Sequence, residues 1–166
     1  MADLAHAFLE RSRGYMSEYL SKIERCLGEL SDEDVWWRPY ESSNSIGNLM
    51  LHLQGNVGQW IIGGVGQRPF ERNRQQEFDA RSPLPWRRLF ASLKTTVGQA
   101  DEVMRAVEPS ALLDRRQIQD SDVTVLEAVY HVVEHFGMHT GQIITLSKMR
   151  TGKDLKLWRP RNTATS

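Results

Sequence analysis

Three histidines recur at four-residue intervals near the C-terminal end of the chain. His131, His135 and His139 lie in the segment HVVEHFGMHTGQ, and they are three of the five histidines in the sequence. At about 3.6 residues per turn, this spacing places the three imidazoles along one face of a helix. Two imidazoles one turn apart, such as His135 and His139, can chelate a divalent cation. A third imidazole from another helix would complete a site with open positions for water.

A fourth histidine, His52, lies in another segment with a strong helical pattern. With Asn48, Asn56 and Gln59 it forms a polar strip beside the apolar positions of that helix. The strip contains neither Lys nor Glu, the usual residues of a solvent-facing helix side. It therefore predicts a site lined by side chains inside a helical bundle, with His52, His135 and His139 as metal ligands. The alternative interpretation is that the histidines are partly buried polar groups that bind no metal.

A second motif overlaps the same residues. His131, Glu134 and His135 fit the H-x-x-E-H pattern of inverted zinc peptidases, in which the glutamate is the general base. That pattern requires a carboxylate further along the chain as third ligand. The only acidic residue after Glu134 is Asp154, beyond the end of the expected helix. The peptidase interpretation is therefore the weaker of the two.

The three-histidine hypothesis implies a definite chemistry. Three neutral imidazoles leave a divalent ion its full charge, which strongly acidifies a bound water or thiol. The thiolate would attack an electrophile, whereas an activated water would attack an ester or amide carbonyl. His131, one turn from the pair, is a candidate proton shuttle or hydrogen-bond donor beside the ligands. Glu134 is a second candidate for a catalytic role, although it lies about 100° from His135 around the helix.

Two helices are predicted in the first half of the chain. Apolar residues recur with helical spacing over about residues 3–27, and Gly28 suits a C-terminal cap. The apolar stripe of this helix consists of Leu4, Phe8, Tyr15, Tyr19, Ile23 and Leu27. The second helix is expected to begin after Ser45, a favourable N-cap, and to run to about Ile62, where a run of glycines ends it.

Two more helices are predicted in the second half. The third starts at Pro85 and ends before Pro109, because proline suits a first helical turn and not a helix interior. The fourth opens with a capping-box pattern at Thr124 and Glu127 and runs to about Arg150. No alternating run is long enough for a substantial strand.

Four long amphipathic helices predict an all-α fold, a four-helix bundle that forms one domain over residues 1–166 with its core at about 3–152. The connections 28–44 and 63–84 are long for bundle loops, which typically take about 2–8 residues. They contain tryptophan, tyrosine, phenylalanine and proline, so we expect ordered loops packed over one end of the bundle. The second is rich in Arg, Gln and Glu, which favours a solvated loop over a lid that grips a ligand. Residues 115–122 have room for a short extended piece.

Composition excludes several classes of function. Lys plus Arg and Asp plus Glu both number 21, and the pI is near 7.0, so nothing favours binding to nucleic acid or to an anionic membrane. The apolar runs fall far short of the roughly 20 residues that span a bilayer, and the N-terminal segment has no signal-peptide pattern. The single cysteine, Cys26, forms no intrachain disulfide and suits a reducing cytoplasm. A cytoplasmic protein is expected.

Several segments together are similar to one known family. Ser45–Leu49 followed by His52 resembles the helix that carries the first metal histidine of that family, and His135 and His139 followed by Gly141-Gln142 resemble its last-helix motif. The family is the DinB/YfiT-like superfamily of bacterial four-helix-bundle proteins. Three further segments resemble an uncharacterised subgroup of it: Trp36-Trp37-Arg38-Pro39, Gly55-Asn56 and the stretch from Phe70 to Phe78. The similarity spans roughly residues 5–155.

The resemblance implies an up-down-down-up bundle in which His52, His135 and His139 bind one divalent ion, commonly zinc or nickel. It also implies a homodimer. Related enzymes transfer low-molecular-weight thiols to electrophiles or isomerise a thiol-linked substrate. The chain departs from the common His-His-Arg-Gly-Gln motif, since Met138 and Thr140 stand in place of the first histidine and the arginine. That arginine would supply a contact to an anionic cosubstrate.

Three functional interpretations follow, in this order. The first is a metal-dependent transferase or hydrolase that acts on a small electrophilic substrate, with a low-molecular-weight thiol as a candidate partner. The second is a non-catalytic, metal-stabilised protein with a binding or stress-response role. The third is a structural dimerisation domain whose histidines are core polar groups.

Overall fold

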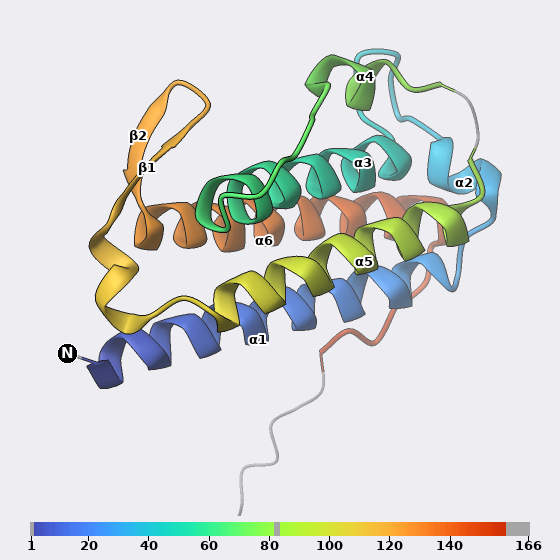
Figure 1. Ribbon diagram of the computed structural model, residues 1–166. Coiled ribbons are helices and arrows are strands. Elements are labelled where there is room, and N and C mark those ends of the chain that lie inside the picture. The colour runs from blue at the N-terminus through green and yellow to red at the C-terminus, as the bar shows by residue number, and fades with distance from the viewer. Residues whose placement is uncertain (1, 82–83, 159–166) are drawn as a thin grey trace, which may run out of the picture.

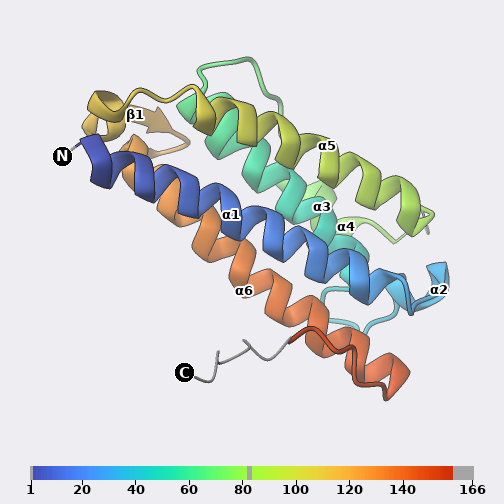
Figure 2. The same ribbon diagram turned by 90° about the horizontal axis from the view of Figure 1, so that it is seen from below.

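Four long helices dominate the protein in a computed structural model that describes residues 2–81 and 84–158 (Figure 1). They are α1 (Ala2–Leu27), α3 (Ile46–Val57), α5 (Trp86–Arg105) and α6 (Val125–Thr151). α1 and α6 run in one direction and α3 and α5 in the other (Figures 1 and 2). The predicted all-α fold, a four-helix bundle of up-down-down-up order, is therefore confirmed. None of the described helices is long and apolar enough to cross a membrane.

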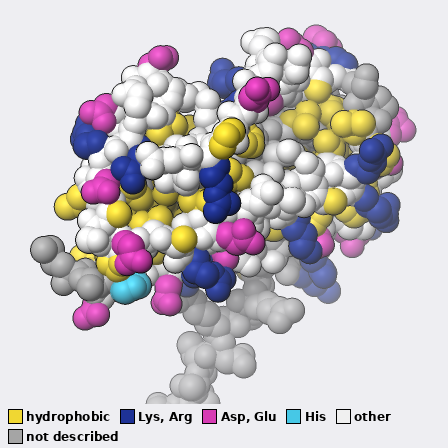
Figure 3. Space-filling view, in the orientation of Figure 1, with side chains coloured by type: hydrophobic (Ala, Val, Ile, Leu, Met, Phe, Trp, Pro, Cys, Tyr) yellow, Lys and Arg dark blue, Asp and Glu magenta, His cyan; other side chains and the backbone are white. Residues whose placement is uncertain are grey.

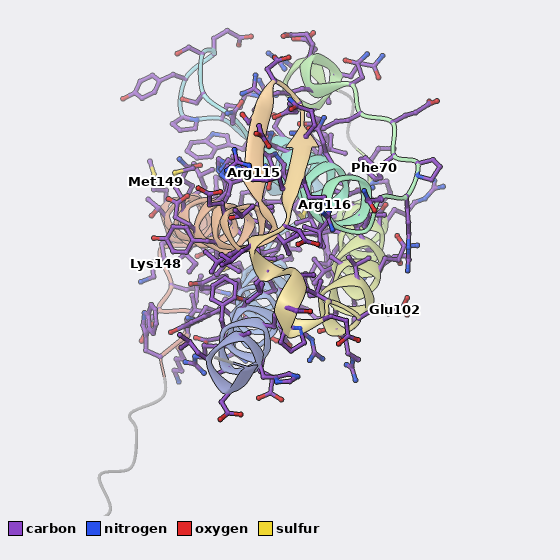
Figure 4. All side chains as sticks on the ribbon, turned by 60° about the vertical axis from the view of Figure 1, so that its left-hand side comes forward. Phe70, Glu102, Arg115, Arg116, Lys148 and Met149 are labelled. Atoms are coloured by element: carbon purple, nitrogen blue, oxygen red, sulfur yellow. The ribbon has the colours of Figure 1, made fainter. Side chains whose placement is uncertain are left out.

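Shorter elements fill the connections. They are α2 (Asp32–Trp36), α4 (Arg74–Asp79), the 3-10 helix η2 (Pro109–Leu113) and the strands β1 (Arg115–Ile118) and β2 (Ser121–Thr124). The strands pair antiparallel, with Arg115 opposite Thr124 and Ile118 opposite Ser121. The short extended piece expected at 115–122 thus consists of β1, the turn and the first half of β2. This hairpin stands at one end of the bundle (Figure 4).

Local side-chain signals explain where the helices begin and end. Ser45 and Asn48 form a reciprocal capping box at the start of α3, and Thr124 and Glu127 form another at the start of α6. Gly152 adopts φ 65° and ends α6 with a left-handed cap. These boundaries agree with the sequence prediction to within a residue.

The second predicted helix differs from the observed one. α3 passes without a break into the π-helix η1 (Gly58–Val65), so the helical backbone runs through the glycines at 63 and 64 that were expected to stop it. The apolar side chains of Ile61, Ile62 and Val65 are buried, and β1 packs against this end of the helix. This burial keeps the segment helical despite its low helix propensity.

The buried stripe of α1 is also displaced from the predicted one. Leu4 is 76% exposed, and Phe8, Tyr15 and Tyr19 are only partly buried. The residues that face the core include Ala5, Leu9, Met16, Ile23 and Leu27. The aromatic side chains lie at the edge of this stripe, where Tyr19 stacks on Phe136 of α6 with 6.3 Å between ring centroids.

The direction of the helices explains the longest connection. Because α3 and α5 run in parallel, the chain between them must return along the bundle. Residues 66–81, which we call the strap, make this return across α3 and include α4 (Figure 1). Phe70, which Figure 4 labels on the strap, contacts η1 at Gly58, and Glu77 contacts α3 at Gly55. The strap is therefore seated on the bundle through a few side chains, while most of its other side chains are exposed to solvent, as the sequence predicted.

Candidate metal centre

Three imidazoles converge between α3 and α6. His52 comes from α3 and His135 and His139 from α6, and one candidate ligand atom of each lies within 4.8 Å of the others. The Nε2 atoms of His52 and His135 are 2.9 Å apart. His139 Nε2 is buried and has no hydrogen-bond partner among the described residues. A buried polar nitrogen of this kind requires an explanation, and a cation shared with the two neighbouring nitrogens would supply one.

The antiparallel arrangement of α3 and α6 sets the order of polar side chains in the groove between them. His52 lies opposite His135, and one turn further along, Asn56 lies opposite His131 at 3.4 Å between Asn56 Nδ2 and His131 Nε2. His131 also stacks on Trp60 of η1, with 4.2 Å between ring centroids. Figure 3 shows one face of the molecule, on which histidine colour appears only where α1 begins. The three-histidine cluster is therefore covered on that face.

A carboxylate from the strap binds the far side of the His52 ring. His52 Nδ1 lies 2.9 Å from Glu77 Oε2 and 3.1 Å from Arg72 Nη2. A carboxylate only accepts hydrogen bonds, and an arginine only donates them. Arg72 already donates to both Glu77 oxygens, at 2.6 and 2.8 Å. His52 Nδ1 therefore carries a proton donated to Glu77, and its Nε2 lone pair faces the cluster.

Gln142 binds His139 in a corresponding way. His139 Nδ1 lies 2.7 Å from Gln142 Oε1, so the ring donates its Nδ1 proton to the amide carbonyl. This tautomer leaves the lone pair of the unpartnered His139 Nε2 free. His52 and His139 thus both present bare Nε2 atoms, the form of imidazole that binds a metal.

Burial keeps the histidines of α6 neutral. It lowers the pKa of His135 to about 3, with smaller contributions from the charges of His139, His52 and His131. Burial also lowers the pKa of His139, against the hydrogen bond to Gln142, and it lowers the pKa of His131. Because neutral imidazole is the form that binds a cation, burial favours metal binding by these rings at neutral pH.

Glu77 is ionised although it is buried. Burial by itself would raise the pKa of this carboxyl, but the hydrogen bonds from Arg72 and His52 outweigh it and hold the pKa below its usual value. An ion pair therefore lies on the side of His52 that is turned away from the cluster, with Glu77 Oε2 as its atom nearest the ring. The carboxylate that accepts the Nδ1 proton increases the basicity of the ring nitrogen that faces the cluster.

Comparison with known proteins supplies the family. Residues 3–162 match the family described as "Protein of unknown function (DUF1572)". The chain belongs to this family. A comparison with curated protein sequences found no match.

Solved structures show the fold that this DUF1572 protein shares. A conserved protein from Enterococcus faecalis is 15% identical, with a TM-score of 0.74 over 87% of this chain and 97% of the other. A DinB-like protein from Bacillus cereus ATCC 10987 is also 15% identical, with a TM-score of 0.69 over 90% of this chain and 94% of the other. The resemblance to DinB/YfiT-like bundles is thereby confirmed at the level of the fold.

Neither of the two predicted catalytic residues, His131 and Glu134, joins the cluster of this DUF1572 protein. His131 lies one turn away, against Trp60 and Asn56. Glu134 is exposed on α6, and its charge acts to raise the pKa of His131 and His139 against the effect of burial. The histidines that gather are His52, His135 and His139, which is not the set that the H-x-x-E-H pattern requires.

Arg72 and Glu77 were not identified from the sequence. They lie in a charged segment without periodicity, 20 and 25 residues from His52. The signal available was topological, because two parallel helices require a return connection that crosses the bundle. Nothing in the residues themselves indicates which charged side chains of that connection turn inward.

Proposed function

We propose that this protein binds one divalent cation through His52, His135 and His139 and uses it to activate a small-molecule substrate. The unpartnered, buried Nε2 of His139 beside the close pair of His52 and His135 carries this proposal. The DinB-like fold and the three-histidine cluster are compatible with a metal-binding bundle. Three imidazole nitrogens suit zinc or nickel among the common divalent ions.

The reaction that fits best is a transfer or hydrolysis at a polar electrophile. A zinc or nickel ion bound by the three rings would supply a Lewis acid that acidifies a coordinated water or thiol. His131 lies one turn from His135 and stacks on it, with 5.3 Å between ring centroids, so we propose its ring as the acceptor of the released proton. Asn56 Oδ1 is buried and has no hydrogen-bond partner in the part of the chain that the structure describes, so it can accept a hydrogen bond from a bound molecule. For Glu134, which is solvent-exposed, we propose proton exchange with solvent.

A cleft lined in part by α6 offers room for a substrate, although none of the three histidines lines it. Its volume is about 670 Å³, and it borders Gln142, the hydrogen-bond partner of His139. Polar and apolar groups both line it, including Ser43, Asn44, Met138 and Leu146. Thr140, in the position of the common arginine, is buried and donates its hydroxyl to the Phe136 carbonyl at 2.8 Å. A low-molecular-weight thiol would therefore be held by the cleft rather than by a cation at position 140.

Metal content and turnover together test the proposal. Protein prepared without a histidine tag is expected to contain about one metal ion per chain and to lose it in His52→Ala and in His139→Ala. It should keep most of the metal in His131→Ala. Turnover with a panel of thiols, electrophiles and esters should disappear in His139→Ala. The proposal would be contradicted if wild-type protein still contained no metal after reconstitution, or if turnover survived in His139→Ala.

A non-catalytic, metal-stabilised binding protein is the second candidate. Burial of His52 and His139 favours it, because a fully enclosed ion has little room for substrate. This alternative predicts a metal-dependent rise in melting temperature with no turnover on any of the substrates above.

The organisation of the protein in the cell belongs to the same proposal. The DinB/YfiT-like resemblance supports a homodimer, which light scattering would detect. The buried Cys26 thiol supports a reducing, cytoplasmic location. We further propose that residues 1–166 form a single domain, which would unfold in one cooperative transition.

A further inference from the structure

A buried ion pair in the strap carries an inference about the metal site. The side chains of Arg72 and Glu77 are only 5% and 10% exposed. Removing two charges from water costs several kcal/mol for each ion, and their attraction repays this only when the geometry is good. A return connection needs no such pair in order to cross the bundle. We therefore look for the role of this ion pair in the residues that it contacts.

The neighbour of the pair is a histidine of the cluster. Arg72 Nε donates to Glu77 Oε1 at 2.6 Å and Arg72 Nη2 to Glu77 Oε2 at 2.8 Å, which is a two-pronged contact. Glu77 Oε2 also accepts the proton of His52 Nδ1 at 2.9 Å. The carboxylate thus has its position fixed by the arginine and fixes in turn the orientation of the imidazole.

The far end of the network is anchored on other elements. Arg72 Nη1 donates to Gln59 Oε1 at 2.9 Å, and the same oxygen accepts from Gln119 Nε2 at 2.8 Å. Gln59 belongs to η1, and Gln119 lies in the hairpin turn with φ 54°. The arginine is therefore held by Glu77 of the strap and by Gln59 of the π-helix, and the hairpin in turn holds Gln59.

We propose that Glu77, held by Arg72, is the positioning residue that fixes the tautomer and ring orientation of His52 for metal binding. The inference rests on the proposed function, because it concerns the same metal site. Histidine ligands generally donate their other N–H to a carboxylate or carbonyl, and loss of that partner typically weakens metal affinity by about 10–100-fold. Gln142 performs the corresponding role for His139 with a neutral carbonyl.

The first test measures zinc affinity by competition with a chromophoric chelator. The variant Arg72→Met/Glu77→Leu removes both charges together and leaves no unpaired ion in the interior. Glu77→Gln is a second, nearly isosteric variant in case the double variant does not fold. The matched control is Asp101→Asn, which alters the ion pair of Asp101 with Arg13 between α1 and α5, away from the cluster.

We expect zinc to bind about 10–100-fold more weakly to the double variant, and Glu77→Gln to lie between it and wild type. Asp101→Asn should bind zinc like wild type. Zinc affinity of the double variant and of Glu77→Gln within twofold of wild type would overturn the inference and leave the proposed function standing. Failure of wild-type protein to bind zinc would overturn both.

A second measurement reads the tautomer without metal. Nitrogen-15 NMR of labelled histidine should show His52 as the Nδ1–H tautomer in metal-free wild type and a shift toward Nε2–H in the double variant. A purely structural ion pair would lower the melting temperature of the variant without changing either tautomer or zinc affinity. An Nε2–H tautomer of His52 in wild type would overturn the inference.

Discussion

Gly55 and Glu77 approach so closely that a Cβ atom on residue 55 would lie 2.0 Å from Glu77 Oε1. The same Cβ would lie 2.7 Å from Arg72 Nε. Glycine in a helix interior costs about 1 kcal/mol relative to alanine, so α3 gives up helix propensity at this position and admits the ion pair.

The first prediction concerns Gly55→Ala. The new methyl group must displace the carboxylate and guanidinium, so we expect zinc affinity to fall and unfolding free energy to drop by about 1–3 kcal/mol despite the better helix propensity. Chelator competition and urea denaturation measure the two quantities. The control is Gly98→Ala in α5, where nothing lies within 4 Å of the added Cβ. That variant should gain up to about 1 kcal/mol and keep its zinc affinity. Equal behaviour of the two variants would contradict the prediction.

The second prediction concerns Asn48, which joins the start of α3 to the strap. Its Nδ2 group lies within hydrogen-bond distance of three strap carbonyls, those of Glu77, Phe78 and Ala80, at 2.8–3.3 Å. Asn48→Asp keeps the shape but turns an acceptor toward those carbonyls, at a cost on the order of 1–3 kcal/mol per unsatisfied group. Thermal unfolding should show the loss. A melting temperature equal to wild type would mean that the strap is not held at this point.

The third prediction links metal binding to stability. A ligand that binds only the folded protein stabilises it by about 2.7 kcal/mol at a free concentration 100 times its Kd. We therefore expect zinc to raise the unfolding free energy of metal-free protein by about this amount and a chelator to reverse the change. In His139→Ala the increment should vanish. An equal increment in that variant would place the bound metal elsewhere.

The fourth prediction concerns pH. The hydrogen bond from Arg13 holds the pKa of Asp101 below its usual value, and the contact with Arg105 adds to this effect. A carboxyl with a lowered folded-state pKa stabilises the protein above its unfolded pKa, and this contribution is lost as the pH falls through the folded pKa. Asp101→Asn should therefore cost about 0.2–1 kcal/mol at pH 7 and progressively less at acid pH. Urea denaturation at both pH values measures the difference. A cost that does not change with pH would contradict an ionic contribution.

Much of the fold could be predicted from the sequence because its signals are local. Each capping box, at Ser45 and at Thr124, joins two residues that are three positions apart, and Gly152 directly follows the helix that it ends. The η1 helix could not be predicted, since a π-helix closes i to i+5 hydrogen bonds and has no distinct residue pattern. The predicted stripe of α1 was displaced because its aromatic side chains lie at the edge of the core, whereas Ala5, Leu9 and Met16 face it.

The candidate site was predictable in part for a related reason. Helical periodicity relates His135 to His139, and the polar strip pointed to His52. Metal ligation by these three residues, and roles for His131 and Glu134, stay predictions. The contact of His52 with Glu77 spans 25 residues and depends on how the strap lies across α3, which no local pattern encodes.

The strap is seated on α3 near Asn48 and Gly55 and on the start of η1 at Gly58. To swing outward it would have to break the buried amide contacts, the ion pair and the Phe70 packing together. An outward swing of the strap would therefore cost several interactions at once, and the metal binding we propose needs no closing motion on this side. Of the three ligand candidates, His135 has the most open surroundings, which favours exchange of small molecules with the cluster past α6.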